Sequence, residues 1–139
     1  MTGILALIIQ VHGYWRWVLL LVAVVVAIKF LIGWLRHQKM QATDLTLGSL
    51  FAGFMTLQFV LGLIILIGYI STGAFNPRIH IEHALYGLIA VGISHALPLS
   101  KADRPDVVRF RTSFFMVLVS LLIIGLSVIR LRGGWVWSP

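Results

Sequence analysis

The sequence contains no cysteine among its 139 residues. Without thiolates the chain cannot form a disulfide, hold zinc or an iron–sulfur cluster through sulfur, or attach a c-type haem covalently. Histidine is therefore the main side chain left for binding a metal or a tetrapyrrole, and the chain has five histidines.

Charge is also scarce. Charged residues make up 11% of the chain and hydrophobic residues 60%, with a mean hydropathy of +1.01. Soluble proteins are about one quarter charged, so the composition predicts an integral membrane protein. Uncharged stretches of roughly 18 or more residues are typical of spanning helices, and this length has room for about four in a single transmembrane domain, 1–139. The N-terminus lacks the basic region and cleavage site of a signal peptide, so we expect the first helix to be retained.

The positive charge has a pattern of its own. The formal net charge is +7, a value that also occurs in nucleic-acid-binding proteins. The Lys and Arg residues, however, flank apolar runs and do not form one solvated patch. We therefore expect a lipid bilayer as the surroundings and no nucleic acid as a partner.

The apolar runs predict four helices, at about 4–35, 45–70, 79–97 and 112–130. Thr43 and Asp44 are candidate caps of the second helix. The predicted fold class is all-α, an integral membrane four-helix bundle with up-down topology. Most Lys and Arg lie in the connections 36–44 and 99–111, so the positive-inside rule places these in the cytoplasm and both termini on the outer side.

His12 and His83 are the candidate ligand pair. Both lie near the beginning of helices that run in the same direction, so they are expected at similar depth in the outer half of the membrane. Two imidazoles from facing helices are a standard way to hold a haem in a bundle. Gly87 lies one turn after His83 on the same face and leaves room for the porphyrin edge. The alternative is that His12 belongs to an interfacial aromatic belt and that His83 is an interfacial or capping imidazole.

Haem propionates need cationic partners, and arginine suits carboxylates because its planar fork donates two hydrogen bonds. Arg16, about 6 Å beyond His12 along the first helix, is expected to bond a propionate, a backbone carbonyl or a partner subunit. Arg130, with Arg78 and Arg132, is a further candidate, although contact with lipid headgroups is the simpler role for each of these three. Glu82 is expected to pair with Arg78 or His80.

Two other polar residues bear on the number of haems. His95 is twelve residues after His83 and points in another direction around the helix. No second spanning helix offers a histidine at its depth, so one haem is expected instead of two. Gln58 lies near mid-bilayer and must find a hydrogen-bond partner, either as a link between helices or, less simply, at a haem edge or a quinone carbonyl.

Three short stretches carry a resemblance to a known group: His12-x-x-x-Arg16-Trp17, Leu57-Gln58-x-x-Leu61-Gly62-Leu63-Ile64 and Glu82-His83. With them the chain resembles small bacterial four-helix membrane proteins labelled cytochrome b or cytochrome b-like. The resemblance implies haem b with His12 and His83 as axial ligands, and location in the bacterial inner membrane. The chain lacks the histidine pairs, about fourteen residues apart, of two-haem cytochromes b, so their electron route across the membrane is not implied.

These observations favour a one-haem b-type cytochrome that relays electrons on the outer side of the membrane. Its partners would be a quinol or an outer redox protein and a larger respiratory or photosynthetic complex. The main alternative is a non-redox accessory subunit of such a complex. A third possibility, in which His12 and His83 singly bind a chlorophyll-type pigment or hold a copper ion, ranks lower. Copper transport usually requires clusters of methionine or cysteine, and the four methionines here are scattered. An enzyme with its own chemistry is the least favoured reading, because the chain offers no nucleophile–base pair and no carboxylate cluster.

Overall fold

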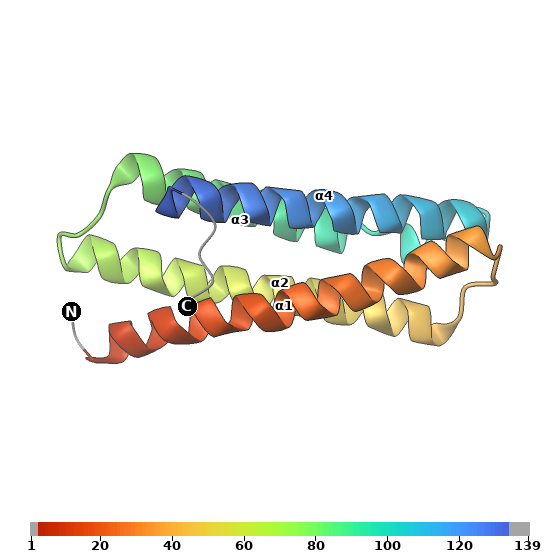
Figure 1. The fold of residues 1–139 in the computed structure, drawn as a ribbon, viewed down its shortest axis with the longest axis horizontal. Helices are drawn as coiled ribbons and strands as arrows, with labels where there is room; N and C mark the ends of the chain where they lie inside the picture. Colours follow the sequence, from red (N-terminus) through yellow and green to blue (C-terminus); the bar gives the residue numbers. More distant parts are fainter. Residues whose placement is uncertain (1–2, 134–139) are drawn as a thin grey trace.

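The computed structural model describes residues 3–133 and is all-helical, which confirms the all-α part of the predicted fold class. Four long helices run side by side along the molecule (Figure 1). They are α1 (Gly3–Leu35), α2 (Ala42–Ser71), α3 (Pro77–His95) and α4 (Asp106–Arg132), and a short 3₁₀ helix, η1 (Pro98–Ser100), lies between α3 and α4.

The helix boundaries differ from the predicted ones mainly at N-terminal ends. α2 begins at Ala42 because Gln41, and not Thr43 or Asp44, occupies the cap position. Asp44 contributes from inside the first turn, where its Oδ2 accepts the backbone N–H of Gln41 at 2.9 Å. α4 begins six residues before the predicted position, and Arg109 pairs with Asp106 one turn earlier at 2.7 Å.

The other ends follow ordinary capping rules. At the start of α3 the Asn76 side chain accepts the N–H of Ile79, and proline occupies the first helical position. After α1, His37 adopts a left-handed φ of 49°. The N–H groups of His37 and Gln38 bond the carbonyls of Trp34 and Gly33, which is the Schellman arrangement that usually has glycine at this place.

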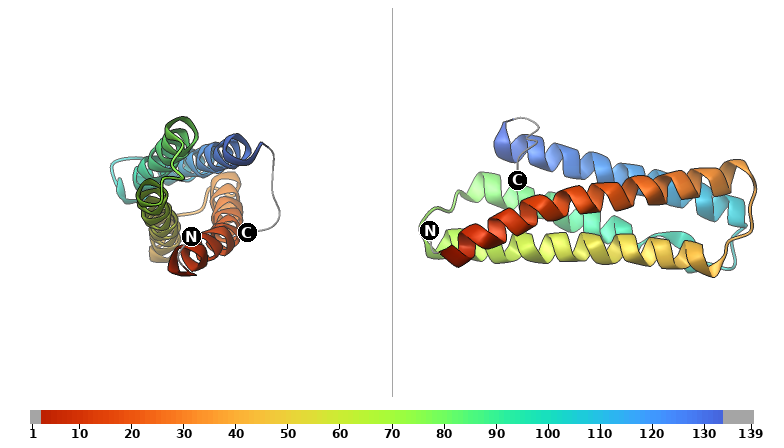
Figure 2. Two further views of the ribbon diagram at one scale, coloured as in Figure 1. Left: turned by 90° about the vertical axis from the view of Figure 1, so that its left-hand side faces the viewer. Right: turned by 60° about the horizontal axis from the view of Figure 1, so that its bottom comes forward.

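Successive helices run in opposite directions, and the end-on view puts them at four corners (Figure 2). α1 packs against α2 and α4, and α3 packs against the same two helices. Within residues 3–133 the backbones of the diagonal pairs, α1 with α3 and α2 with α4, do not approach each other. Space along the diagonal is therefore left for side chains or for a bound group.

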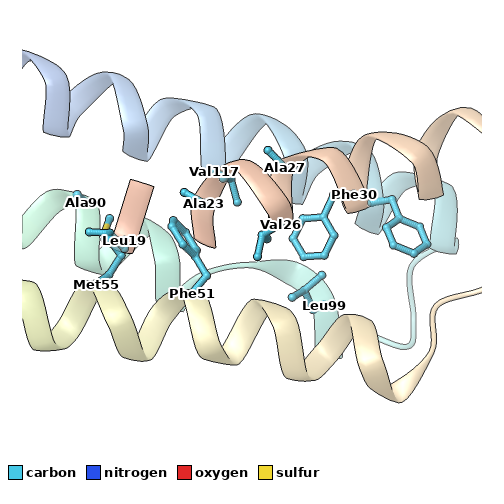
Figure 3. Packing of buried hydrophobic residues seen from close by; sticks show 11 residues of the cluster. Leu19, Ala23, Val26, Ala27, Phe30, Phe51, Met55, Ala90, Leu99 and Val117 are labelled. Carbon is cyan, nitrogen blue, oxygen red and sulfur yellow. The ribbon is translucent and has the colours of Figure 1, made fainter. Parts of the chain in front are cut away.

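The apolar core fills the middle of the molecule and the end that holds the α1–α2 connection. α1 contributes Leu19, Ala23, Val26 and Phe30, which meet Phe51 of α2, Val117 of α4 and Leu99 beyond α3 (Figure 3). Leu99 packs directly over Gly48. The segment after α3 thus fills the place in the core that a longer α3 would occupy.

The outer surface of the molecule is apolar over most of its length, with exposed leucine, isoleucine and valine on all four helices. α1, α2 and α4 are long and apolar enough to cross a membrane. Four spans were predicted, and α3 does not reach this standard within the described residues. The reason lies in its first two turns, where four polar or charged side chains lower its hydropathy: Arg78, His80, Glu82 and His83.

Candidate cofactor-binding site

His12 of α1 and His83 of α3 face each other across the diagonal of the four helices. Their ring centroids lie 6.3 Å apart and the ring planes are inclined by 68°. Both side chains are partly buried. The structure thus brings together the two histidines that sequence reasoning had paired, although their helices have no backbone contact.

The two rings line a cavity of about 360 Å³ between all four helices. The cavity lies towards the end of the molecule where α1 begins, and it adjoins the apolar core through Met55 and Ala90, which belong to both. Its walls are largely aliphatic and aromatic. Polar side chains reach it from each helix: His12, Arg16, Gln58, His80, His83, Ser127 and Arg132. A mostly apolar pocket with a few convergent polar groups is typical of a cofactor site.

His83 is oriented by α4. Its Nδ1 lies 2.6 Å from the hydroxyl oxygen of Ser127, which is only 4% exposed. A hydrogen bond at Nδ1 fixes the ring and leaves Nε2 for another partner. Sequence reasoning missed Ser127, although a signal exists: Ser113, Ser120 and Ser127 recur every seven residues and are all buried.

His12 has a different environment. Its Nε2 lies 3.1 Å from the amide nitrogen of Gln58 on α2. Its Nδ1 is buried and has no hydrogen-bond partner within the described part of the chain. Gln58 therefore acts as the link between helices that the sequence analysis favoured, and its partner is the candidate ligand itself.

Two glycines of the cavity wall allow close approach. A Cβ atom on Gly62 would lie 3.3 Å from Cε1 of His12, which is tighter than ordinary contact. A Cβ atom on Gly87 would lie 3.0 Å from the Phe59 ring. Gly87 lines the cavity, but Phe59, a wall residue that the sequence analysis did not single out, occupies the space beside it. The room expected there for a porphyrin edge stays a prediction.

The candidate cations divide into two groups. Arg16 is 5% exposed and lines the cavity, and its guanidinium carbon lies 5.2 Å from the centroid of the Trp17 ring. Arg130 is exposed and bonds Glu82 at 3.0 Å, while Arg78 lies 3.8 Å from the same carboxylate. The expected pairing of Glu82 with Arg78 is confirmed. Arg130 does not line the cavity, and its proposed contact with a propionate stays a prediction.

The remaining histidines are held elsewhere or in other ways. His80 lines the cavity, but its Nδ1 accepts the N–H of Asn76 at 3.0 Å and its ring stacks on Tyr69. His95 is exposed and bonds Thr56 at 2.9 Å, outside the cavity, as its helical position predicted. Only His83 on α3 is placed opposite His12.

The side chains of the cavity can be compared with the ligands that the expected haem requires. Among residues 3–133 there is no cluster of three or more histidine and acidic side chains that would enclose a bare metal ion. Two imidazoles alone suit a metal whose other ligands come from a macrocycle. The largely apolar walls and the two facing imidazoles are compatible with such a group. The chain has no match among known protein families, curated proteins or solved structures.

Proposed function

We propose that this protein is an integral membrane cytochrome of the b type with one haem, held between His12 and His83. The single observation that carries the proposal is the pair of imidazoles, 6.3 Å apart, brought from diagonal helices into one largely apolar cavity. Its partners would be a quinol or an outer redox protein and a larger respiratory or photosynthetic complex.

The residues that line the cavity would have different roles. His12 and His83 would hold the haem iron through ring nitrogens, and Arg16 with Arg132 would be available to the propionates from the cavity wall. When bound, haem supplies reversible one-electron chemistry at its iron. The aliphatic wall of α2 and α4 would exclude water. Such exclusion, together with hydrogen bonding to the ligand histidines, is how a protein tunes a haem potential.

A membrane location is supported by the distribution of side chains, which is the reverse of that in a soluble protein. Apolar side chains cover the outside, while Arg16, Asp44, Arg109 and several serines are buried inside. Polar side chains in spanning helices are expected to face the interior of a bundle. We further propose the bacterial inner membrane, with the 36–41 and 96–105 connections in the cytoplasm and both termini outside, because these connections are basic.

The experiment is a spectrum of the purified, haem-supplied protein in detergent. We expect a reduced-minus-oxidised band of the b type and one haem b per chain in a pyridine haemochrome assay. His83→Ala should lower haem occupancy at least tenfold, since even outer-shell partners of a ligand are worth about 10- to 100-fold. His95→Ala, on the same helix but outside the cavity, is the matched control. Absence of the band, or full occupancy in His83→Ala, would refute the proposal.

A second candidate function is a non-redox accessory subunit of a membrane complex. It is favoured by the exposed pair of Thr56 and His95 on the α2–α3 face, since a polar pair among apolar side chains indicates contact with another protein. Under this reading the protein purified without its complex is colourless, and His95→Ala weakens association with the complex. The same spectrum therefore separates the two candidates.

A further inference from the structure

The two facing histidines differ in which ring nitrogen is already in use. The bond from Ser127 engages Nδ1 of His83, at 2.6 Å. The bond from Gln58 engages Nε2 of His12, at 3.1 Å, while Nδ1 of His12 is buried and has no hydrogen-bond partner among residues 3–133. The pair is therefore chemically unsymmetrical, although both rings border the same cavity.

We propose that His83 is the permanent ligand of this site, with Ser127 as its positioning residue, and that His12 is an exchangeable ligand for which Gln58 competes. The inference rests on the proposed haem function. It adds a place where a small neutral molecule, such as carbon monoxide, can take the position of His12.

The assignment for His83 follows from the chemistry of a neutral imidazole, which has one N–H donor and one acceptor nitrogen. If Ser127 accepts a hydrogen bond from Nδ1–H, the lone pair resides on Nε2, the nitrogen that a metal requires. A ligand histidine commonly donates its other N–H to a fixed oxygen, which sets the tautomer and the ring orientation. Ser127 is nearly fully buried, so water does not compete with it.

The assignment for His12 follows from competition for one atom. When the Gln58 amide donates to Nε2, it occupies the lone pair that a metal would use. Coordination through this nitrogen must break that hydrogen bond, whereas coordination through His83 keeps the bond to Ser127. Displacement of His12 by another ligand returns Nε2 to Gln58, so this side of the site is the easier one to open.

The tautomers can be measured in the unloaded protein by NMR of ¹⁵N-labelled histidine. His80 provides an internal reference, because a backbone N–H donates to its Nδ1 and so its proton must be on Nε2. We expect His83 to show the opposite tautomer. Ser127→Ala should convert His83 to a mixture of tautomers, while Ser120→Ala, one heptad earlier and equally buried, should leave it unchanged. A proton on Nε2 of His83 in the wild type would overturn the inference.

The exchange can be measured in the haem-loaded protein after reduction with dithionite. Carbon monoxide should bind, with the bond from the metal to His12 breaking and the bond to His83 remaining. Gln58→Leu removes the competitor, so its affinity for carbon monoxide should fall by about three- to tenfold, the equivalent of one net hydrogen bond. Thr56→Val, on α2 but outside the cavity, is the control.

Ligand removal gives a third arm. His12→Ala should retain more haem than His83→Ala and should bind carbon monoxide without displacement. Equal loss of haem in the two variants, or no effect of Gln58→Leu, would refute the inference while leaving the haem proposal intact. A chain that binds no haem refutes the proposed function, and the NMR arm still decides the assignment of the hydrogen bonds.

Discussion

At Gly33 of α1, the absence of a side chain sets how closely α1 and α4 approach. A Cβ atom there would lie 2.6 Å from the Phe110 ring, which is itself fully buried in the core. A rigid ring surrounded by packed neighbours has nowhere to move. We expect Gly33→Ala to lower the free energy of unfolding by about 1–3 kcal/mol, the usual cost of overpacking.

The measurement is thermal unfolding in detergent, with Gly53→Ala as the control. Outside its own helix backbone and chain neighbours, no atom of residues 3–133 lies within 4 Å of a Cβ atom at Gly53. That change should therefore be neutral or slightly stabilising, because alanine is the better helix former. Equal stability of the two variants would contradict the close contact between α1 and Phe110.

Single residues also mark how far sequence reasoning reaches into the candidate site. His12 and His83 could be paired from the sequence because a histidine in an apolar helix is costly and both lie near helix starts. Ser127 could not be assigned to His83, because a serine in a spanning helix is equally suited to bond its own helix or a neighbour. The contact depends on the rotation of α4, which no local pattern determines.

At the scale of the element, Asp44 holds the α1–α2 connection in place. This side chain is 1% exposed, lies 3.2 Å from Nζ of Lys29 on α1, and accepts the N–H of Gln41 at the start of α2. One carboxylate thus joins the end of one helix to the beginning of the next. We expect Asp44→Ala to lower the free energy of unfolding by about 1–3 kcal/mol, through loss of the cap and of a half-buried ion pair.

The test compares unfolding of Asp44→Ala with that of Asp103→Ala, an exposed acid in the connection before α4. Both changes remove one negative charge, so a general effect of net charge would appear in both variants. A melting temperature that falls equally in the two, or in neither, would contradict the role given to Asp44.

The ends of the helices were harder to predict than their existence. The reason is visible at the α1–α2 and α3–α4 connections. The apolar runs located all four helices, but α2 and α4 extend beyond those runs through polar first turns. In α4 the charged residues Asp106 and Arg109 continue the helix because they pair with each other, and Asp106 also accepts the N–H of Met40. Those bonds depend on the tertiary neighbours, so hydropathy alone placed the start of α4 too late.

At the scale of the whole molecule, the cavity is a consequence of how the helices are arranged. Each helix touches two neighbours and leaves the diagonal open, and at one end the diagonal is filled by Phe30, Phe51 and Phe110. At the other end glycines and histidines replace these rings. The sequence predicted the number of helices, but the diagonal placement of α1 and α3 follows from their packing. Only with that placement do His12 and His83 become a facing pair.

Orientation in the membrane is testable because the chain has no cysteine of its own. Thr72 lies exposed in the α2–α3 connection and Ala102 exposed in the α3–α4 connection, at opposite ends of the molecule. Since the connection around Ala102 is basic, the positive-inside rule predicts that it lies in the cytoplasm. An impermeant maleimide that enters only the periplasm should therefore label Thr72→Cys in intact cells, and label Ala102→Cys only after lysis. The reverse pattern would invert the proposed orientation and place His12 and His83 on the cytoplasmic side. Labelling of both in intact cells would exclude a span between them.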